Sequence, residues 1–425
     1  MKRFFLILFV TLALLGPPQA LAEPETPLTL DQAMGIAIEN NPQLKATQAR
    51  LGISQAEIIT AGARLNPAFV TDNGIAEGTT RVGIEQTFEL GGKRKKRVAL
   101  AQARQSVVSA EINTIFLDIR ANVRRAYTQL FNAQERQRNY EEILRTTQKL
   151  LDVAKEREEA GDVARLDVLQ ARIVTISAKN ELQTAAYQVT EARNRLNALL
   201  NQPLQSSVSL LPPGVTPQTV PPTKGISLQG SVIQAEADLN SLIETALTRR
   251  PELQQNLNSL TVAQRQLELA QANRVPNLNL TVGPDIVYRN PNNNVNQINA
   301  YAAASLELPV FNRQQGPIQE AIASRKQLEL QQAALKNQIT LEVTSAYTAF
   351  VSSRERVKRY ETELLPEAQQ IIDLSRESFQ EGKSSILVPL SAQQAYQDTR
   401  TGYLQALMDY QTAISDLERA VGSGL

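Results

Sequence analysis

The spacing of apolar residues along the chain changes from helical to alternating and back again, and it does so twice. Apolar positions at helical spacing predict one helix over about Leu30–Arg64, with Asp31 near its start. The next segment alternates with a period of two, which places Val82, Ile84 and Phe88 on one face and polar residues on the other. The pattern therefore predicts strands between two helical regions.

A long helical hairpin is predicted after these strands. No proline or glycine occurs from Lys93 to Ala160, and a helix of that length extends over about 100 Å. Gly161 and Asp162 break the pattern, and a return helix is expected over about Leu166–Leu200. The apolar positions of this return helix follow the 3-4-3 spacing of a coiled coil: Leu166, Leu169, Ile173 and Ile176.

The second half of the chain repeats this plan. Residues 28–70 align with residues 237–279, and Pro42 then matches Pro251. The second hairpin breaks at Gly382, and Pro366 is expected to kink its descending helix. The predicted organisation begins with a signal peptide at 1–22 and a first repeat at 23–202, which has strands at about 67–90 and a helical hairpin at about 93–200. A Pro-rich linker follows at 203–236. The second repeat is at 237–425, with strands at about 277–309 and a hairpin at about 313–420.

The first residues have the features of an export signal. Lys2 and Arg3 precede an apolar run over 4–15, and Ala20-Leu21-Ala22 fits a cleavage site with small residues. The run is shorter than the roughly 20 residues that cross a bilayer, so a short N-terminal anchor is the less favoured alternative. Cleavage would leave an exported chain that begins at Glu23.

The predicted strands fit an outer-membrane barrel. In the second half Leu278, Leu280 and Val282 alternate with Asn279 and Thr281. Strands of roughly ten residues with one apolar and one polar face are typical of such barrels, although a half-buried sheet in a soluble domain alternates in the same way. The export signal favours the barrel. Four strands cannot close one alone, so several chains must share it, and counting strands allows three copies or two.

Composition excludes several classes of site. The chain has no cysteine, histidine or tryptophan, which rules out histidine-based triads, thiolate zinc sites and iron–sulfur clusters. Lys plus Arg is 44 and Asp plus Glu is 43, and this balance argues against a nucleic-acid partner. We predict no catalytic residue, no cofactor and no metal site. Signal cleavage leaves only Met34 and Met408 as sulfur ligands, so selection of a soft metal is expected to lie outside this chain.

Several motifs occur in the same order in both halves. They are Leu30-Asp31-Gln32-Ala33, Asn41-Pro42-Gln43-Leu44, the segments Phe88–Arg94 and Leu308–Arg313, and the hairpin turns Gly161–Ala171 and Gly382–Ala392. On these motifs the chain resembles the TolC family of outer-membrane efflux proteins over essentially the whole mature chain. The segment Glu89-Leu90-Gly91-Gly92-Lys93-Arg94 is similar to the CzcC-type heavy-metal branch of that family.

The resemblance implies a mainly α fold with a small β part. Two tandem repeats of a helix, two strands and a long helical hairpin would form, in a homotrimer, a 12-stranded barrel in the outer membrane above an α-helical tunnel through the periplasm. Such a channel is not an enzyme. It would contact outer-membrane lipid, a periplasmic adaptor (membrane fusion protein) and an inner-membrane pump of RND or ABC type.

The implied function is passive conduction of pump substrates to the exterior, with metal ions as the cargo of the heavy-metal branch. Three alternatives remain: an exit duct for drugs or type I protein secretion, a free diffusion porin, and a periplasmic coiled-coil adaptor. The two ~100 Å helices argue against the porin. The strands repeated in each half argue against the adaptor.

By the same resemblance, the hairpin tips form the periplasmic entrance and contact the adaptor. These tip residues are Gly161, Asp162, Val163, Ala164, Arg165, Leu166, Gly382, Lys383, Ser384, Ser385 and Ile386. Five acidic residues near the tips are candidates for an entrance ring that favours cations: Glu158, Glu159, Asp162, Glu377 and Glu381. The competing interpretation, which we prefer for most of them, is that they lie on a solvated helix face and form ordinary ion pairs. Arg81 and a basic run at 93–97 would meet lipid headgroups or line the junction below the barrel.

Overall fold

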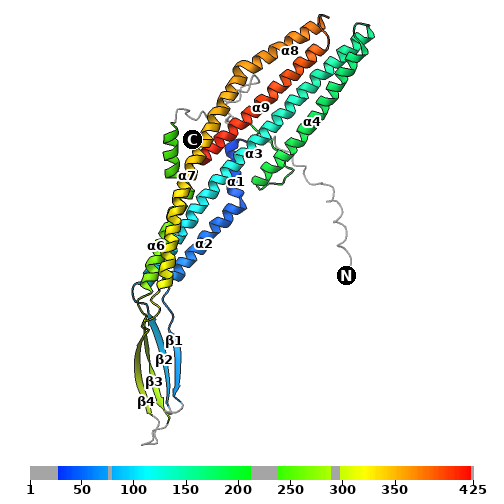
Figure 1. Ribbon diagram of the computed structural model, residues 1–425. Helices are drawn as coiled ribbons and strands as arrows, with labels where there is room; N and C mark the ends of the chain where they lie inside the picture. Colours follow the sequence, from blue (N-terminus) through cyan, green and yellow to red (C-terminus); the bar gives the residue numbers. More distant parts are fainter. Residues whose placement is uncertain (1–26, 75–78, 212–237, 289–296, 423–425) are drawn as a thin grey trace, which may run out of the picture.

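A computed structural model describes residues 27–74, 79–211, 238–288 and 297–422. The expected signal peptide at 1–22 lies outside the described residues, as does most of the Pro-rich segment at 203–236. The molecule is elongated, with a small sheet at one end and the turns of two helical hairpins at the other (Figure 1).

The two halves of the chain contain the same sequence of elements. The first half has α1 (Leu30–Asn40), α2 (Pro42–Gly62), β1 (Ala68–Gly74), β2 (Thr79–Phe88), α3 (Lys93–Glu159) and α4 (Arg165–Leu199). The second half has α5 (Leu239–Arg249), α6 (Pro251–Ala272), β3 (Leu278–Val287), β4 (Gln297–Leu306), α7 (Gln315–Arg359), a π-helical turn (Tyr360–Leu364), α8 (Leu365–Gln380) and α9 (Leu387–Val421).

The single helix expected over 30–64 is wrong, because α1 and α2 are separate helices. Asn41 lies between them with extended backbone angles (φ −65°, ψ 118°). Pro42 imposes this conformation, since a proline disfavours helical angles in the residue before it. The Asn41 side chain then accepts a hydrogen bond from the backbone N–H of Leu44 (2.9 Å) and caps α2.

Pro366 is accommodated without ending the second descending helix. The π-helical turn Tyr360–Leu364 ends two residues before Pro366, and the N–H of Leu365 bonds to the carbonyl of Tyr360. A proline has no N–H and crowds the preceding turn, and a wider π turn relieves both effects. The descending helix therefore consists of α7 and α8 joined through this turn (Figure 1).

The four strands form one antiparallel sheet in the order β1-β2-β3-β4. One row across the sheet is apolar, with Phe69 opposite Ile84, Ile84 opposite Val282, and Val282 opposite Ala302. Phe69, Ile84 and Val282 are 72%, 55% and 58% exposed. A soluble domain would bury such a face, so its exposure supports a sheet whose apolar face meets lipid.

The helices form a single-layer wall along the length of the molecule. Next to the sheet the order is α2-α3-α6-α7, because α3 contacts both α2 and α6, and α6 contacts α7. Toward the tips the order is α4-α3-α9-α8 (Figure 1). Among the described residues, no helix is both long enough and apolar enough to cross a membrane.

The helical wall is thickest midway along its length, where α1 and α5 pack against the long helices. One apolar cluster joins α1 to α3 and α4, and a second joins α5 to α7 and α9. Tyr127 is fully buried in the first cluster, and its hydroxyl lies 2.6 Å from the carbonyl oxygen of Leu211. Its repeat counterpart Tyr347 is only half-buried, so the two repeats differ at their centre.

The predicted apolar stripe on α4 is not the face that packs within the chain. Leu166, Leu169, Ile173 and Ile176 are each more than two-fifths exposed. The helix packs on α3 through a different stripe at heptad-like spacing: Val168, Ala171, Ala178, Ala185, Val189 and Leu196. Helix α4 therefore carries two apolar seams, and one of them has no partner among the described residues.

Candidate functional site

Both hairpin tips are built in the same way. Gly161 and Gly382 follow α3 and α8 with φ of +83° and +74°. The N–H of the next residue bonds back to the helix, Asp162 to the carbonyl of Arg157 (2.8 Å) and Lys383 to the carbonyl of Ser378 (2.9 Å). This is the Schellman C-cap, and glycine suits it because a side chain strains the left-handed conformation.

The predicted tip residues differ in how much surface they offer. Leu166 is 62% exposed, whereas Ile386 is 1% exposed and packs in a cluster with Leu150 and Phe379. Ile386 therefore supports the tip from inside. The tip residues with exposed side chains are Asp162, Ala164, Arg165, Leu166, Lys383 and Ser385, while Val163 and Ser384 are half-buried.

Arg157 joins the two hairpins just behind their tips. Its Nη1 donates a hydrogen bond to the carbonyl of Phe379 (3.0 Å), and its guanidinium lies 4.9 Å from the centroid of the Phe379 ring. The Phe379 side chain is 1% exposed, so this contact has a fixed partner. Nothing local in the sequence indicates this contact, because the two residues are 222 positions apart.

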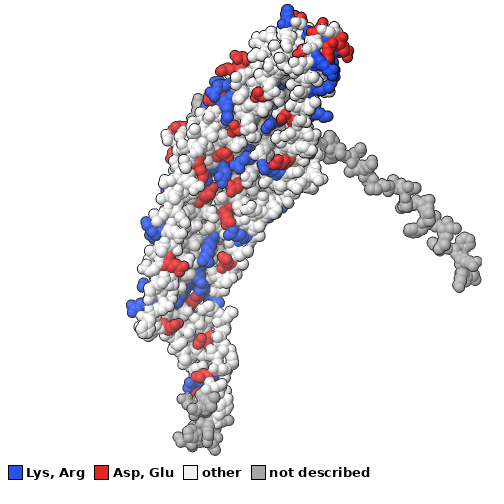
Figure 2. All heavy atoms as spheres, turned by 45° about the vertical axis from the view of Figure 1, so that its right-hand side comes forward, with Lys and Arg blue, Asp and Glu red and all other residues white. Residues whose placement is uncertain are grey.

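The acidic candidates do not form a purely acidic surface. Glu381 pairs with Lys383 (2.5 Å), and Glu158 is half-buried while Glu159, Asp162 and Glu377 are exposed. Figure 2 shows acidic and basic side chains together at this end of the molecule. Within one chain the tips therefore present mixed charge, which agrees with the solvated-face interpretation for some of these residues.

The basic run at 93–97 connects the helices to the sheet end. Lys93 Nζ bonds to Asn277 Oδ1 (2.5 Å), Lys96 pairs with Glu268 (2.9 Å), and Arg97 pairs with Glu89. Hydrogen bonds from Lys96 and Arg265 hold the pKa of Glu268 below its usual value. In the described part of the chain, Arg94 and Lys95 are exposed and make no side-chain ion pair, so only these two remain available to a lipid headgroup.

All four charged residues in the strands lie on the polar face of the sheet. Asp72, Arg81, Asp285 and Asn299 form one row across the four strands, and Glu85 lies on the same face. Arg81 lies 3.6 Å from a carboxylate oxygen of Asp72 and 3.7 Å from one of Asp285. Two carboxylates therefore share the Arg81 guanidinium, and with the Glu85 carboxylate this face is net negative.

A buried ion cluster holds the turn between α5 and α6. Arg250 is 4% exposed and pairs with Glu252 (3.0 Å) and Glu342 (2.7 Å), and it donates to the carbonyl of Ala420 (3.2 Å). Burial alone would raise the pKa of Glu342, but hydrogen bonds from Gln338 and Arg250 outweigh it and hold the pKa below its usual value. The equivalent position in the first repeat is Asn41, so the cluster belongs to the second repeat alone.

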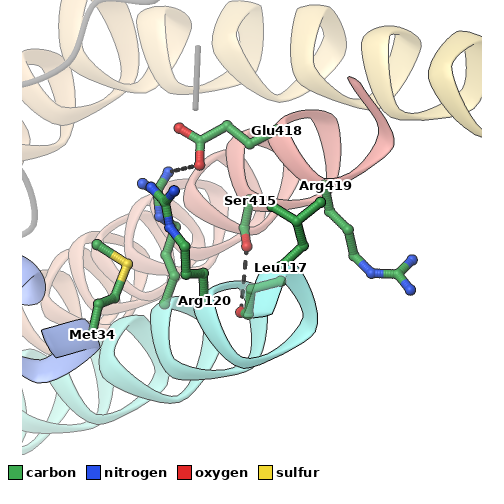
Figure 3. Close-up of a pocket in the computed structure, with 8 residues that line it drawn as sticks. Met34, Leu117, Arg120, Ser415, Glu418 and Arg419 are labelled. Atoms are coloured by element: carbon green, nitrogen blue, oxygen red, sulfur yellow. Dashed lines mark hydrogen bonds and ion pairs between the residues drawn. The ribbon is translucent and has the colours of Figure 1, made fainter. Parts of the chain in front are cut away.

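A small cavity lies between α1, α3 and α9. Met34, Leu117, Arg120 and Ser415 line it, with Glu418 at one side (Figure 3). Its volume is about 20 Å³, which is room for one water molecule. Arg124 is already paired with Glu418 (2.6 Å). The cavity is therefore too small for a cargo molecule, and in the described residues no cluster of carboxylates is placed to hold a metal ion.

Known proteins are similar to this chain in sequence or in structure. CzcC of Cupriavidus metallidurans, a cobalt-zinc-cadmium resistance protein, is 25% identical over 99% of this chain and 100% of its own length. OpmQ of Pseudomonas aeruginosa, a pyoverdine export outer membrane protein, is 23% identical over 93% of this chain and 85% of its own. The solved structure of the outer-membrane channel OprN superposes with a TM-score of 0.74 at 18% identity, covering 93% of this chain and 90% of that one.

The family comparison covers most of the chain. The outer membrane efflux protein family matches residues 33–202 and 242–423, one match in each repeat. The match, the helical wall and the sheet with an exposed apolar face all agree with the fold expected from the sequence. The chain belongs to the outer membrane efflux protein family.

Proposed function

We propose that this outer-membrane efflux channel conducts divalent metal cations that an inner-membrane pump delivers through a periplasmic adaptor. The choice of a cationic cargo rests on the net negative charge of the polar sheet face, where three carboxylates, Asp72, Glu85 and Asp285, outnumber the single Arg81. Negative side chains lining a pore favour cations over anions. CzcC, which aligns with 99% of this chain, is named for cobalt, zinc and cadmium resistance.

The assembly we propose is a cyclic homotrimer. On one side of the chain, β1, α2 and α4 form the free edges of the sheet and the helical wall, and β4, α7 and α8 form the free edges on the other. Apolar side chains are exposed on both sets of helices: Ile59 and Ile173 on the first, and Ile322, Leu330, Ile371 and Leu374 on the second. Unlike edges that meet head to tail generate a ring, and the TolC resemblance implies three copies and twelve strands.

The hairpin tips are the proposed contact with the adaptor. Exposed side chains and two matching glycine turns support this role, because small turns let a partner helix approach closely. We expect Val163→Trp to abolish efflux while the assembled channel remains in the outer membrane. Unchanged efflux in this variant would exclude Val163 from the contact. Lys149→Trp, further from the tip, is the control.

The proposed mechanism is passive and involves no chemical reaction. The pump supplies the energy, and the channel supplies a water-filled path whose wall charge biases which ions enter. We expect no catalysis by this chain. The family's role in transport is the support for that expectation.

Growth of a deletion strain tests the cargo. Loss of the gene is expected to sensitise cells to cobalt, zinc or cadmium but not to lipophilic drugs, and the complete chain should restore growth. Sensitivity to drugs and dyes alone would contradict the metal proposal.

An organic cargo is the second candidate, and the observation that favours it is a pocket in the helical wall.

A further inference from the structure

We propose that the helical wall carries a binding site for an amphipathic organic anion, such as an aromatic sulfonate or carboxylate. The site is a pocket of about 480 Å³ next to the sheet, formed by α2, α3, α6 and α7. Pockets of roughly 300–1,000 Å³ are typical of small-molecule sites. We call it the tunnel-wall pocket.

The order of the helices places this pocket on the inside of the tunnel. The four helices form one layer in the order α2-α3-α6-α7, and the pocket touches all four. A single cavity can reach every helix of one layer only on the concave side of a curved wall. In a closed ring of such walls, the concave side faces the lumen, where cargo passes.

The floor of the tunnel-wall pocket is apolar. Its apolar residues come from all four helices: Ile53, Val107, Val108, Val262, Ala263, Ala321 and Leu328. A channel for hydrated metal ions has no need of such a surface, because an ion with its water shell gains nothing from apolar contact. The apolar body of an organic molecule would release water from this floor on binding.

The charged groups of the pocket lie on the α2 and α3 side. Arg50 lines the pocket and pairs with Glu111 (2.5 Å), whereas Arg104 makes no ion pair or side-chain hydrogen bond with any described residue. Glu57 is the only acidic side chain in the lining, and α6 and α7 contribute no charged group to it. The lining therefore carries two guanidinium groups and one carboxylate.

This distribution selects the class of ligand. Guanidinium groups donate paired hydrogen bonds to carboxylate and sulfonate oxygens, and they are weakly hydrated, so exchange of ligands is easy. The anionic group would meet Arg104, and the apolar body would lie across Val262 and Ala263. The inference deepens the proposed function, since it adds an organic cargo class to a duct that also conducts cations.

Binding to the purified full-length chain in lipid nanodiscs tests the site. The probe is naphthalene-1-sulfonate, read by its fluorescence anisotropy, which is free of tryptophan background because the chain has none. Saturable binding above that of empty nanodiscs is expected. Arg104→Gln should weaken binding at least about tenfold, as expected for loss of one charge-assisted bond. Glu57→Gln should tighten binding, because it removes the only carboxylate of the lining.

Two controls make the result decisive. Arg94→Gln removes an exposed arginine of the same helix outside the pocket and should leave the affinity unchanged. Naphthylmethylammonium has the same aromatic body with a positive charge and should bind more weakly than the sulfonate. Equal effects of Arg104→Gln and Arg94→Gln, or tighter binding of the ammonium probe, would overturn the proposal. The binding experiment contains neither the pump nor a metal ion. Its result therefore does not depend on whether the deletion strain becomes sensitive to metals.

Discussion

At the scale of single residues, Arg250 is the most deeply buried charged side chain in the described part of the molecule. Its three contacts join the α5–α6 turn to α7 and to the end of α9. Arg250→Ala should lower the free energy of unfolding by about 3–5 kcal/mol, because Glu342 loses its partner while partly buried. Thermal unfolding measures the loss. Arg249→Ala, one residue away and exposed, should change stability by less than about 0.5 kcal/mol.

The same cluster predicts a dependence of stability on pH. The folded-state pKa of Glu342 lies below its unfolded value, so its contribution is present above the unfolded pKa and is lost as pH falls through the folded pKa. The unfolding temperature of the native chain should therefore drop as the pH falls below about 4.5. In Glu342→Gln this drop should be smaller. An equal drop in both chains would mean that other carboxylates govern acid stability.

At the scale of elements, the contact of Arg157 with Phe379 couples two hairpins that are far apart in the sequence. Arg157→Ala removes a charged hydrogen bond and a cation–π contact, worth together about 2 kcal/mol. Because this contact holds the two hairpins together at the proposed entrance, its loss should make amide exchange at 158–164 and 378–386 faster. Single channels should also open more often. Lys155→Ala, whose pair with Asp152 lies within α3, is the control and should leave both measurements unchanged.

The unpartnered seam of α4 predicts how copies of the chain assemble. Ile173 is 67% exposed within one chain, and burying a side chain of this size contributes about 1.5–3 kcal/mol. Ile173→Glu should therefore prevent assembly in detergent without unfolding α4, as seen by native electrophoresis and circular dichroism. Thr190→Glu adds the same charge at an exposed polar position on a different face of α4 from Ile173 and should assemble normally. Assembly of both variants would exclude this seam from the interface.

At the scale of the whole molecule, charge and apolar surface are separated along the path that cargo would take. The polar sheet face is net negative, whereas the tunnel-wall pocket has two guanidinium groups over an apolar floor. The double variant Glu85→Gln, Asp285→Asn should reduce the preference for cations. Reversal potentials of single channels in a salt gradient measure this preference. Asp152→Asn, far from the sheet, should leave the reversal potential unchanged, and an equal shift in both variants would refute a role for the sheet face.

The sequence indicated the elements most clearly where one local rule acts alone. The alternation around Val282 indicated the sheet, and the glycines at 161 and 382 indicated turns, because no other residue adopts their backbone angles as readily. The continuous helix over 30–64 was wrong because its apolar spacing continues past Asn41, while Pro42 acts on backbone angles that this spacing does not reveal.

The sequence by itself determined the repeat, the two faces of the strands, the long hairpins and the family. The strand faces and the hairpins depend on neighbours a few residues apart, which a periodic pattern records directly, and the repeat and the family follow from comparing short motifs along the sequence. Only the tertiary structure decided which face of α4 packs, where Arg157 and Arg250 find partners, and that four helices enclose a pocket. These features depend on contacts between distant segments, and a pattern along one helix leaves the identity of its neighbours open.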